Sequence, residues 1–158
     1  MFYVLEKDKS CNSQFVKREY IPVEILFNDT ELVKHLGFYY NDTDLLEFCV
    51  DYDNGYLCKF ILSFCSHYSF INDDIEIPEA EPGRIKLNYP SHNDCDMFSV
   101  SVYNDGIYIK ISKAPVKSFI SSGQLIIGID GNNDVAEVYI YDLSSDEAGF
   151  VKNELTLG

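Results

Sequence analysis

Alternating apolar and polar positions, interrupted by short turn sequences, recur along most of this chain. Three segments each consist of two aromatic or β-branched runs joined by a turn in which glycine stands beside Asn or Asp. They cover residues 45–62, 98–111 and 125–141. A turn of this composition between two such runs is the strongest short-range signal for a β-hairpin. The pattern therefore predicts six strands in three hairpins.

Further strands are predicted outside these hairpins. Residues 84–89 alternate cleanly between polar and apolar positions, and residues 2–5 form a short apolar run. Both segments are expected to be strands. Residues 14–27 alternate imperfectly and contain Pro22. Because proline lacks the N–H that a central strand must donate, this segment is expected to be an edge strand or simply extended.

Two segments predict short helices. Residues 28–37 begin with residues that favour the N-cap, and they end at Gly37, which can close a helix in the left-handed conformation. Residues 144–147 can begin a second helix, but Gly149 interrupts it. We therefore predict an α+β fold that is predominantly antiparallel β, a hairpin-rich sheet with one or two short helices.

The length and composition favour a single folded domain. The chain has 158 residues, of which 46% are hydrophobic and 24% are charged, values typical of globular proteins. We expect one domain over residues 1–158. A polar stretch with two prolines at 72–83 divides the sequence, so the sheet is expected to have two parts separated there.

The charge adds a functional constraint. Asp and Glu number 26 against 12 Lys and Arg, a formal net charge of −14. A surface with this much negative charge repels nucleic acid and anionic membranes, and it attracts basic partners from a distance. We see no signal peptide or membrane-spanning run, and we expect a cytoplasmic protein with reduced thiols. The cysteines are irregularly spaced: Cys11, Cys49, Cys58, Cys65 and Cys95.

No motif for metal binding or catalysis is apparent. Residues 130–134 carry acids at EF-hand positions, but Val135 stands where that loop needs glycine and Tyr141 where it needs glutamate. No Cys-x-x-Cys pair suggests zinc. A nucleophile elbow, a phosphate loop and a dinucleotide fingerprint are also absent from the sequence. We therefore expect no metal, no cofactor and no catalytic residues.

Two catalytic arrangements stay open, because residues distant in sequence can meet in the fold. One is a Cys–His dyad, with His67 beside Cys65 or Cys95. The other is a pair of carboxylates two residues apart, acting on a cationic or sugar substrate. Turns and loops are the preferred explanation of these pairs, which are Asp51 with Asp53 and Asp94 with Asp96.

The acids concentrate in two clusters, which we predict to bind a partner. The first cluster lies beside a tyrosine pair and comprises Tyr39, Tyr40, Asp42, Asp44, Asp51 and Asp53. The second lies in a proline-framed segment and comprises Asp73, Asp74, Glu76, Glu79 and Glu81. Carboxylates bind Lys and Arg strongly, and tyrosines serve as interface anchors. A solvated face that keeps the protein soluble is the alternative explanation.

In its size, acidity, 12 Tyr and 11 Phe, hairpin-rich pattern and lack of catalytic motifs, the chain resembles the small acidic immunity proteins of bacterial toxin systems, such as contact-dependent growth inhibition. The resemblance implies a cytoplasmic protein that blocks a cognate toxin domain, often a basic nuclease. It transfers no residue role, because no motif carries it. The alternative is an acidic regulatory module or nucleic-acid mimic that binds a basic host protein. The oligomeric state is left open.

Overall fold

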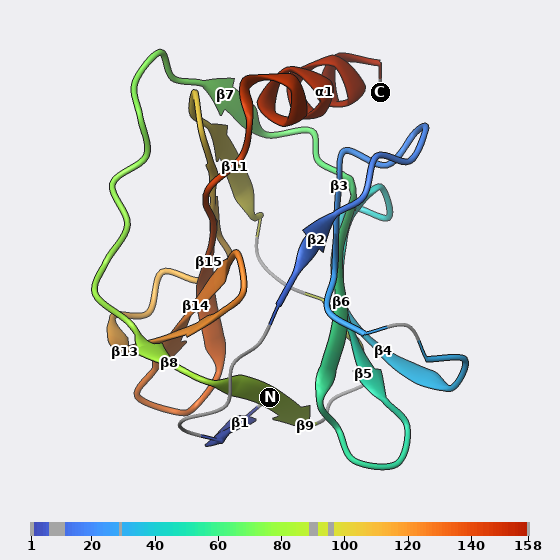
Figure 1. Cartoon of the computed structure of the whole chain (residues 1–158), viewed down its shortest axis with the longest axis vertical. Coiled ribbons are helices and arrows are strands. Elements are labelled where there is room, and N and C mark those ends of the chain that lie inside the picture. Colours follow the sequence, from blue (N-terminus) through green and yellow to red (C-terminus); the bar gives the residue numbers. More distant parts are fainter. Residues whose placement is uncertain (1, 7–11, 29, 89–91, 95–96, 158) are drawn as a thin grey trace.

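Two large β-sheets pack face to face in the computed structural model (Figure 1). A helix lies across one end of the pair, and a two-stranded sheet lies at the other end (Figure 1). The structure describes residues 2–6, 12–28, 30–88, 92–94 and 97–157. Within these ranges no helix is both long and apolar enough to cross a membrane.

The first large sheet is built mainly from the N-terminal part of the chain. Its strands are β2 (Gln14–Phe15), β3 (Val23–Leu26), β4 (Val33–Tyr40), β5 (Asp44–Asp51), β6 (Leu57–Phe64) and β10 (His92–Asp94). They are arranged in the order β10-β4-β5-β6-β3-β2. All neighbours are antiparallel except β10, which runs parallel to β4.

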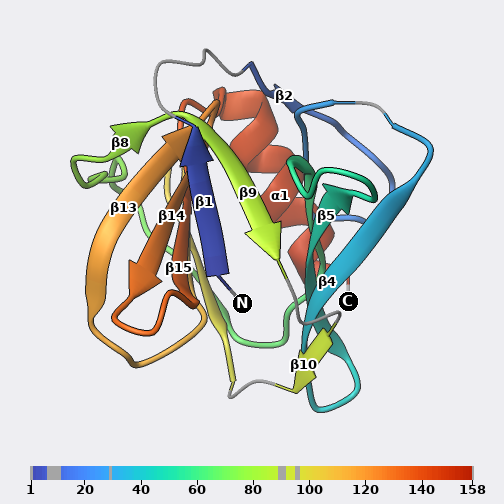
Figure 2. The same ribbon diagram turned by 90° about the horizontal axis from the view of Figure 1, so that it is seen from below.

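The second large sheet comes from the rest of the chain. Its strands are β7 (Tyr68–Phe70), β8 (Glu81–Pro82), β11 (Ser99–Val102), β12 (Ile107–Lys110), β13 (Val116–Ser122), β14 (Leu125–Asp130) and β15 (Val135–Ile140). Their order is β7-β11-β12-β15-β14-β13-β8, with β7 and β8 as parallel edges. The small sheet pairs β1 (Phe2–Glu6) with β9 (Arg84–Asn88), which lie between the large sheets in Figure 2.

The core fills the space between the two large sheets. Phe48 and Phe60 from the first sheet are fully buried, with ring centroids 5.2 Å apart. Ile109 and Ile140 from the second sheet belong to the same cluster of buried side chains. Burying one such side chain stabilises the fold by about 1.5–3 kcal/mol. The alternation seen in the sequence therefore separates a buried face from an outer face on each sheet.

The predicted fold class is confirmed: the structure is α+β and dominated by antiparallel strands. The three predicted hairpins are present as β5–β6, β11–β12 and β14–β15, and the strands expected at 2–5 and 84–89 are β1 and β9. Residues 14–27 contain the edge strand β2 and, directly after Pro22, the inner strand β3.

The helix predicted over residues 28–37 is wrong, because its second half, residues 33–37, belongs to β4. All eight residues of β4 pair with β5, and alternate residues such as Leu36 and Phe38 are buried in the core. The connecting turn places Asn41 and Asp42 at φ 52° and 60°. Positive φ at both central residues is typical of a tight hairpin turn. Pairing with the next strand, β5, thus overrides a two-turn helical pattern.

The C-terminal helix is longer than its sequence suggests. Helix α1 (Ser145–Thr156) begins with a capping box in which the Ser144 Oγ accepts from the Glu147 N–H and the Glu147 carboxylate accepts from the Ser144 N–H. The predicted interruption at Gly149 does not occur. A glycine inside a helix costs only about 1 kcal/mol relative to alanine, and burial of Val151 and Leu155 offsets that cost.

Replacing this glycine is expected to stabilise the protein. Gly149 is exposed, and a Cβ atom there would meet no atom within 4 Å. Gly149→Ala should therefore raise the free energy of unfolding by about 0.5–1 kcal/mol, measured by urea denaturation. Gly55→Ala provides the contrast, because Gly55 has φ +78° and a Cβ would lie 3.2 Å from the Leu87 carbonyl oxygen. It should destabilise the protein; equal effects at both positions would contradict this explanation.

Candidate functional site

A cluster of aromatic side chains lies on the outer face of the seven-stranded sheet. Tyr108 on β12 and Tyr139 on β15 are cross-strand neighbours, with ring centroids 4.8 Å apart. Phe119 on β13 lies 6.1 Å from Tyr139. Residues next to these tyrosines, including Ile109 and Val138, are buried in the core. Because side chains alternate along a strand, the two tyrosines are directed to the opposite, outer face.

Glu137 fixes the tyrosine hydroxyl groups. The Tyr108 hydroxyl donates to Glu137 Oε2 at 2.5 Å, and the Tyr139 hydroxyl donates to Glu137 Oε1 at 3.3 Å. Burial, together with the negative charge of Glu137, raises the pKa of Tyr139 to about 12, and burial and the bond to Glu137 raise the pKa of Tyr108 as well. Both hydroxyls therefore stay protonated at neutral pH, and they hold this carboxylate within the aromatic face.

Residues 71–80, which connect β7 to β8 and which we call the acidic segment, run along this same face (Figure 1). Its backbone is fixed to the β11–β12 hairpin by three hydrogen bonds. They join Ile71 N–H to Val102 O at 2.8 Å, Asn104 N–H to Asp73 O at 3.0 Å, and Ile75 N–H to Asp105 Oδ1 at 2.8 Å. On the side of the segment these three bonds use backbone groups and no carboxylate.

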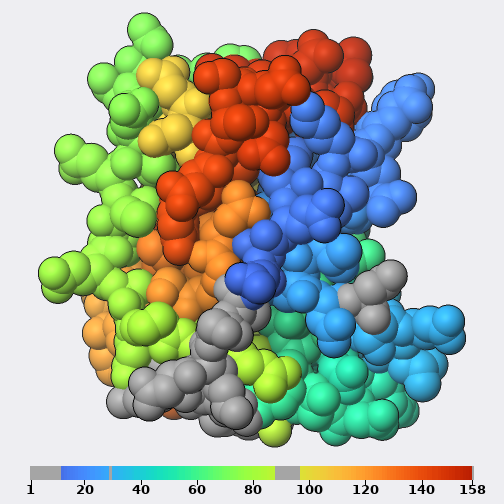
Figure 3. Space-filling model, in the orientation of Figure 1, coloured from blue at the N-terminus to red at the C-terminus, as the bar shows by residue number. Residues whose placement is uncertain are grey.

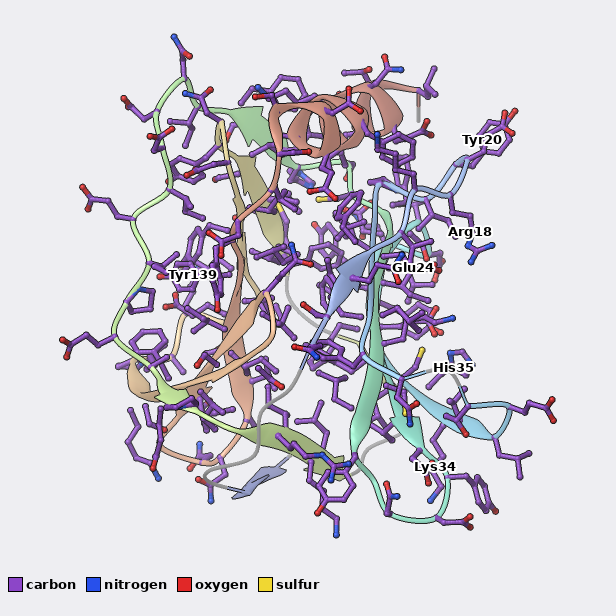
Figure 4. All side chains as sticks on the ribbon, viewed as in Figure 1. Arg18, Tyr20, Glu24, Lys34, His35 and Tyr139 are labelled. Carbon is purple, nitrogen blue, oxygen red and sulfur yellow. The ribbon has the colours of Figure 1, made fainter. Side chains whose placement is uncertain are left out.

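A groove of about 790 Å³ lies between the segment and the tyrosines. It is lined by Ile71, Asp73, Asp74, Ile75, Glu76, Tyr103, Tyr108 and Tyr139. We call it the acidic groove. Figure 4 shows Tyr139 on the side of the sheet that faces the segment, and in Figure 3 the side chains of the segment project from that edge of the molecule. Among its described lining residues none is Lys, Arg or His.

This arrangement suits a cationic ligand. Asp73, Asp74 and Glu76 are exposed at the rim, where each can form a charge-assisted hydrogen bond to an ammonium or guanidinium group. The tyrosine rings below them offer π faces that attract the same groups. The chemistry of the acidic groove therefore complements an ammonium or guanidinium group.

Glu79 and Glu81, the remaining members of the second predicted cluster, continue the acidic line beyond the groove. Glu79 is exposed, and Glu81 lies on β8, where it pairs with Ile120 of β13. The cluster therefore extends across the outer face of the seven-stranded sheet, from the β11–β12 hairpin to the opposite edge at β8. Three of its acids line the groove and two lie outside it.

The first predicted cluster does not form one site. Its tyrosines and Asp42 lie at the β4–β5 turn, whereas Asp51 and Asp53 lie at the β5–β6 turn. These turns are at opposite ends of the eight-residue strand β5, roughly 23 Å apart at the rise of an antiparallel strand. Tyr39 covers Gly37, where a Cβ would be 2.8 Å from the Tyr39 ring.

Asp44, which the sequence predicted to bind a partner, instead has a fully buried side chain. Its carboxylate accepts from the Ser66 N–H at 3.0 Å, the Ser66 hydroxyl at 2.8 Å and the Thr43 hydroxyl at 3.1 Å. These bonds join the start of β5 to the end of β6. Asp44 therefore has a structural role, and a partner cannot reach it in this conformation.

The two alternative catalytic pairings find no support in the described residues. Asp51 Oδ1 accepts from the backbone N–H groups of Asp53 and Asn54, so it caps a turn. A nearby hollow of about 520 Å³ contains these acids together with Lys34 and Lys86, so its charge is mixed. The side chain of Asp94, and all of Asp96, lie outside the described residues.

The Cys65–His67 dyad does not form either. Cys65 is fully buried, and its thiol donates to the backbone carbonyl of His67 rather than to the imidazole ring. Burial raises the pKa of Cys65 to about 12, so the thiol carries no nucleophilic thiolate at neutral pH. Cys49, Cys58 and Cys65 are free thiols, while Cys11 and Cys95 lie outside the described residues.

Sequence reasoning missed the aromatic floor of the acidic groove. The missed residues are Tyr103, Tyr108, Glu137 and Tyr139. A local signal existed: in residues 107–110 and 135–140, polar or aromatic residues alternate with aliphatic ones, which indicates a tyrosine-bearing outer face. Nothing local indicated that the acidic segment would cross that face.

No protein-family model matches this chain, and no relative was found among curated proteins. The chemistry of the acidic groove and the net charge of −14 are therefore the features that indicate what the chain binds.

Proposed function

We propose that this chain is a binding protein that captures a basic partner through the acidic groove, and that it acts in the cytoplasm as an immunity protein that neutralises a basic, nuclease-type toxin domain. The observation that supports this most is the groove itself. Three exposed carboxylates face a tyrosine floor, and the described lining contains no basic residue to neutralise them.

The chemistry of a nuclease explains why such a surface would neutralise it. A protein that acts on nucleic acid needs a positively charged site for phosphates. Carboxylates compete for the same Arg and Lys side chains through charge-assisted hydrogen bonds. The net charge of −14 would also accelerate encounter, because complementary fields raise association rates to about 10⁸ M⁻¹s⁻¹ at low salt. Rapid capture is what protection from a toxin requires.

The decisive experiment uses the neighbouring gene. We expect it to encode a basic C-terminal domain that stops growth when expressed alone and is harmless when this chain is co-expressed. A neighbour that encodes no such domain, or a toxic domain that this chain neither binds nor neutralises, would refute the immunity role. Pull-down from a lysate separates the alternative: recovery of a host nucleic-acid-binding protein would favour a regulatory module or nucleic-acid mimic.

The salt dependence of the complex tests its electrostatic basis. Between about 50 mM and about 200 mM salt, Kd should rise roughly tenfold, mainly through slower association, because screening weakens attraction between exposed charges. Stopped-flow kinetics measures this directly. A complex whose association rate does not change with salt would rule out electrostatic capture, even with the partner correctly identified.

A further inference from the structure

Three potential metal ligands lie together on the outer face of the six-stranded sheet. The acidic groove lies on the other large sheet, so the two features are separate. His35 lies on β4, and Glu47 and Cys49 lie on β5. Nδ1 of His35 is 2.7 Å from Oε2 of Glu47 and 3.4 Å from Sγ of Cys49, and the three ligand atoms lie within 4.8 Å of one another. Figure 4 shows His35 on the side of this sheet that faces away from the other sheet.

The strand register brings these atoms together. His35 is directly opposite Cys49, and Glu47 is opposite Gly37, two positions along the same face. Because Gly37 has no side chain, Glu47 can lean diagonally towards His35. The cluster is therefore positioned by backbone hydrogen bonds on two fully paired strands rather than by a loop.

From this geometry we propose that His35, Glu47 and Cys49 bind a divalent transition-metal ion, for which Zn²⁺ is the best match. Imidazole nitrogen, carboxylate oxygen and thiolate sulfur are all zinc ligands, at about 2.0–2.3 Å. Ligands at those distances in a tetrahedral site lie about 3.3–3.8 Å apart, so shifts on the order of 1 Å would complete the site.

The surroundings suit a site with one open position. Cys49 is 1% exposed, whereas the side chains of Glu47 and His35 are 17% and 57% exposed, so an ion can enter from the His35 side. Burial and the negative charge of Glu47 raise the pKa of Cys49 to about 12, and Lys59, its cross-strand neighbour on β6, offsets this only in part, so a metal ion must displace the thiol proton as it binds. Three protein ligands leave the fourth tetrahedral position to water or to a partner's side chain.

Cobalt titration of the reduced full-length protein tests this proposal. Co²⁺ is used as the probe because thiolate coordination produces a near-ultraviolet charge-transfer band and four-coordinate Co²⁺ absorbs strongly in the visible. We expect saturation at one ion per chain and displacement by Zn²⁺. Cys49→Ser should abolish the charge-transfer band. His35→Gln and Glu47→Gln should each weaken Co²⁺ affinity at least about 10-fold.

A matched cysteine variant completes the test. Cys65 is as buried as Cys49 and lies near another histidine, but it is not part of this cluster, so Cys65→Ala should bind Co²⁺ like the wild type. Circular dichroism of each metal-free variant checks folding, and His35→Gln, at the exposed ligand, is the variant expected to disturb the fold least. Any one of four results would overturn the proposal. Two concern the charge-transfer band of the metal site itself: its absence in the wild type, or its persistence in folded Cys49→Ser. The other two are an unchanged Co²⁺ affinity in His35→Gln and loss of the band in folded Cys65→Ala.

Discussion

Neutralising the three rim carboxylates of the acidic groove is expected to weaken binding of the basic partner on the order of 100-fold. The variant combines Asp73→Asn, Asp74→Asn and Glu76→Gln, which preserve side-chain shape. Each charge-assisted bond at a partly desolvated rim contributes about 1 kcal/mol, and 1.4 kcal/mol corresponds to a tenfold change in Kd. Isothermal titration with the basic domain identified by co-expression measures the loss, and growth assays should show lost protection.

A second triple variant separates the groove from the net charge. Asp42→Asn, Asp53→Asn and Asp142→Asn remove the same charge at exposed positions outside the groove lining. This control should change Kd by less than about threefold, since exposed charges away from the contact act only through weak long-range attraction. If both triple variants weaken binding equally, the acidic groove is not the docking site and the chain acts through its overall charge.

Asp44→Ala is expected to lower the free energy of unfolding by about 3 kcal/mol while leaving partner affinity unchanged for the folded protein. The substitution removes the buried carboxylate that accepts from the Ser66 N–H and from the hydroxyl groups of Ser66 and Thr43. Hydrogen bonds to a charged acceptor contribute about 1.5–3 kcal/mol each, so losing the three bonds that join the start of β5 to the end of β6 is expected to cost about 3 kcal/mol. Urea denaturation followed by circular dichroism gives the change in unfolding free energy.

Asp53→Ala serves as the control, because Asp53 is exposed at a hairpin turn. It should change stability by no more than about 0.5 kcal/mol. A stability of Asp44→Ala equal to that of the wild type would show that the buried network is not structural. A folded Asp44→Ala protein with strongly reduced partner affinity would return Asp44 to the binding surface.

Local sequence signals predicted the hairpins well, because each depends on residues adjacent in the chain. The turn at Gly55, for example, requires the φ of +78° that glycine adopts without strain, and the strands on either side alternate around it. The β4 strand was mispredicted for the opposite reason. Its helical signals were local but weak, and eight cross-strand pairs with β5 decided its conformation.

The sequence showed part of the acidic groove and none of the proposed metal site. The carboxylates of 73–76 stood out because they are consecutive, but their tyrosine floor comes from β12 and β15, more than thirty residues further along. Likewise, His35 and Cys49 are fourteen residues apart, and only the register of β4 with β5 places them opposite each other. The spacing of these residues matches no local motif.

By itself, the sequence determined the charge, the antiparallel β character, the three glycine-containing hairpins and the location of the acidic segment. These depend on composition and on contacts between near neighbours in the chain. The tertiary structure decided that Asp44 is buried, that the acids near β5 are divided between its two ends, and that the acidic segment faces tyrosines. Strand order and register set those outcomes, because they bring together side chains whose separation along the chain carries no signal of their contact.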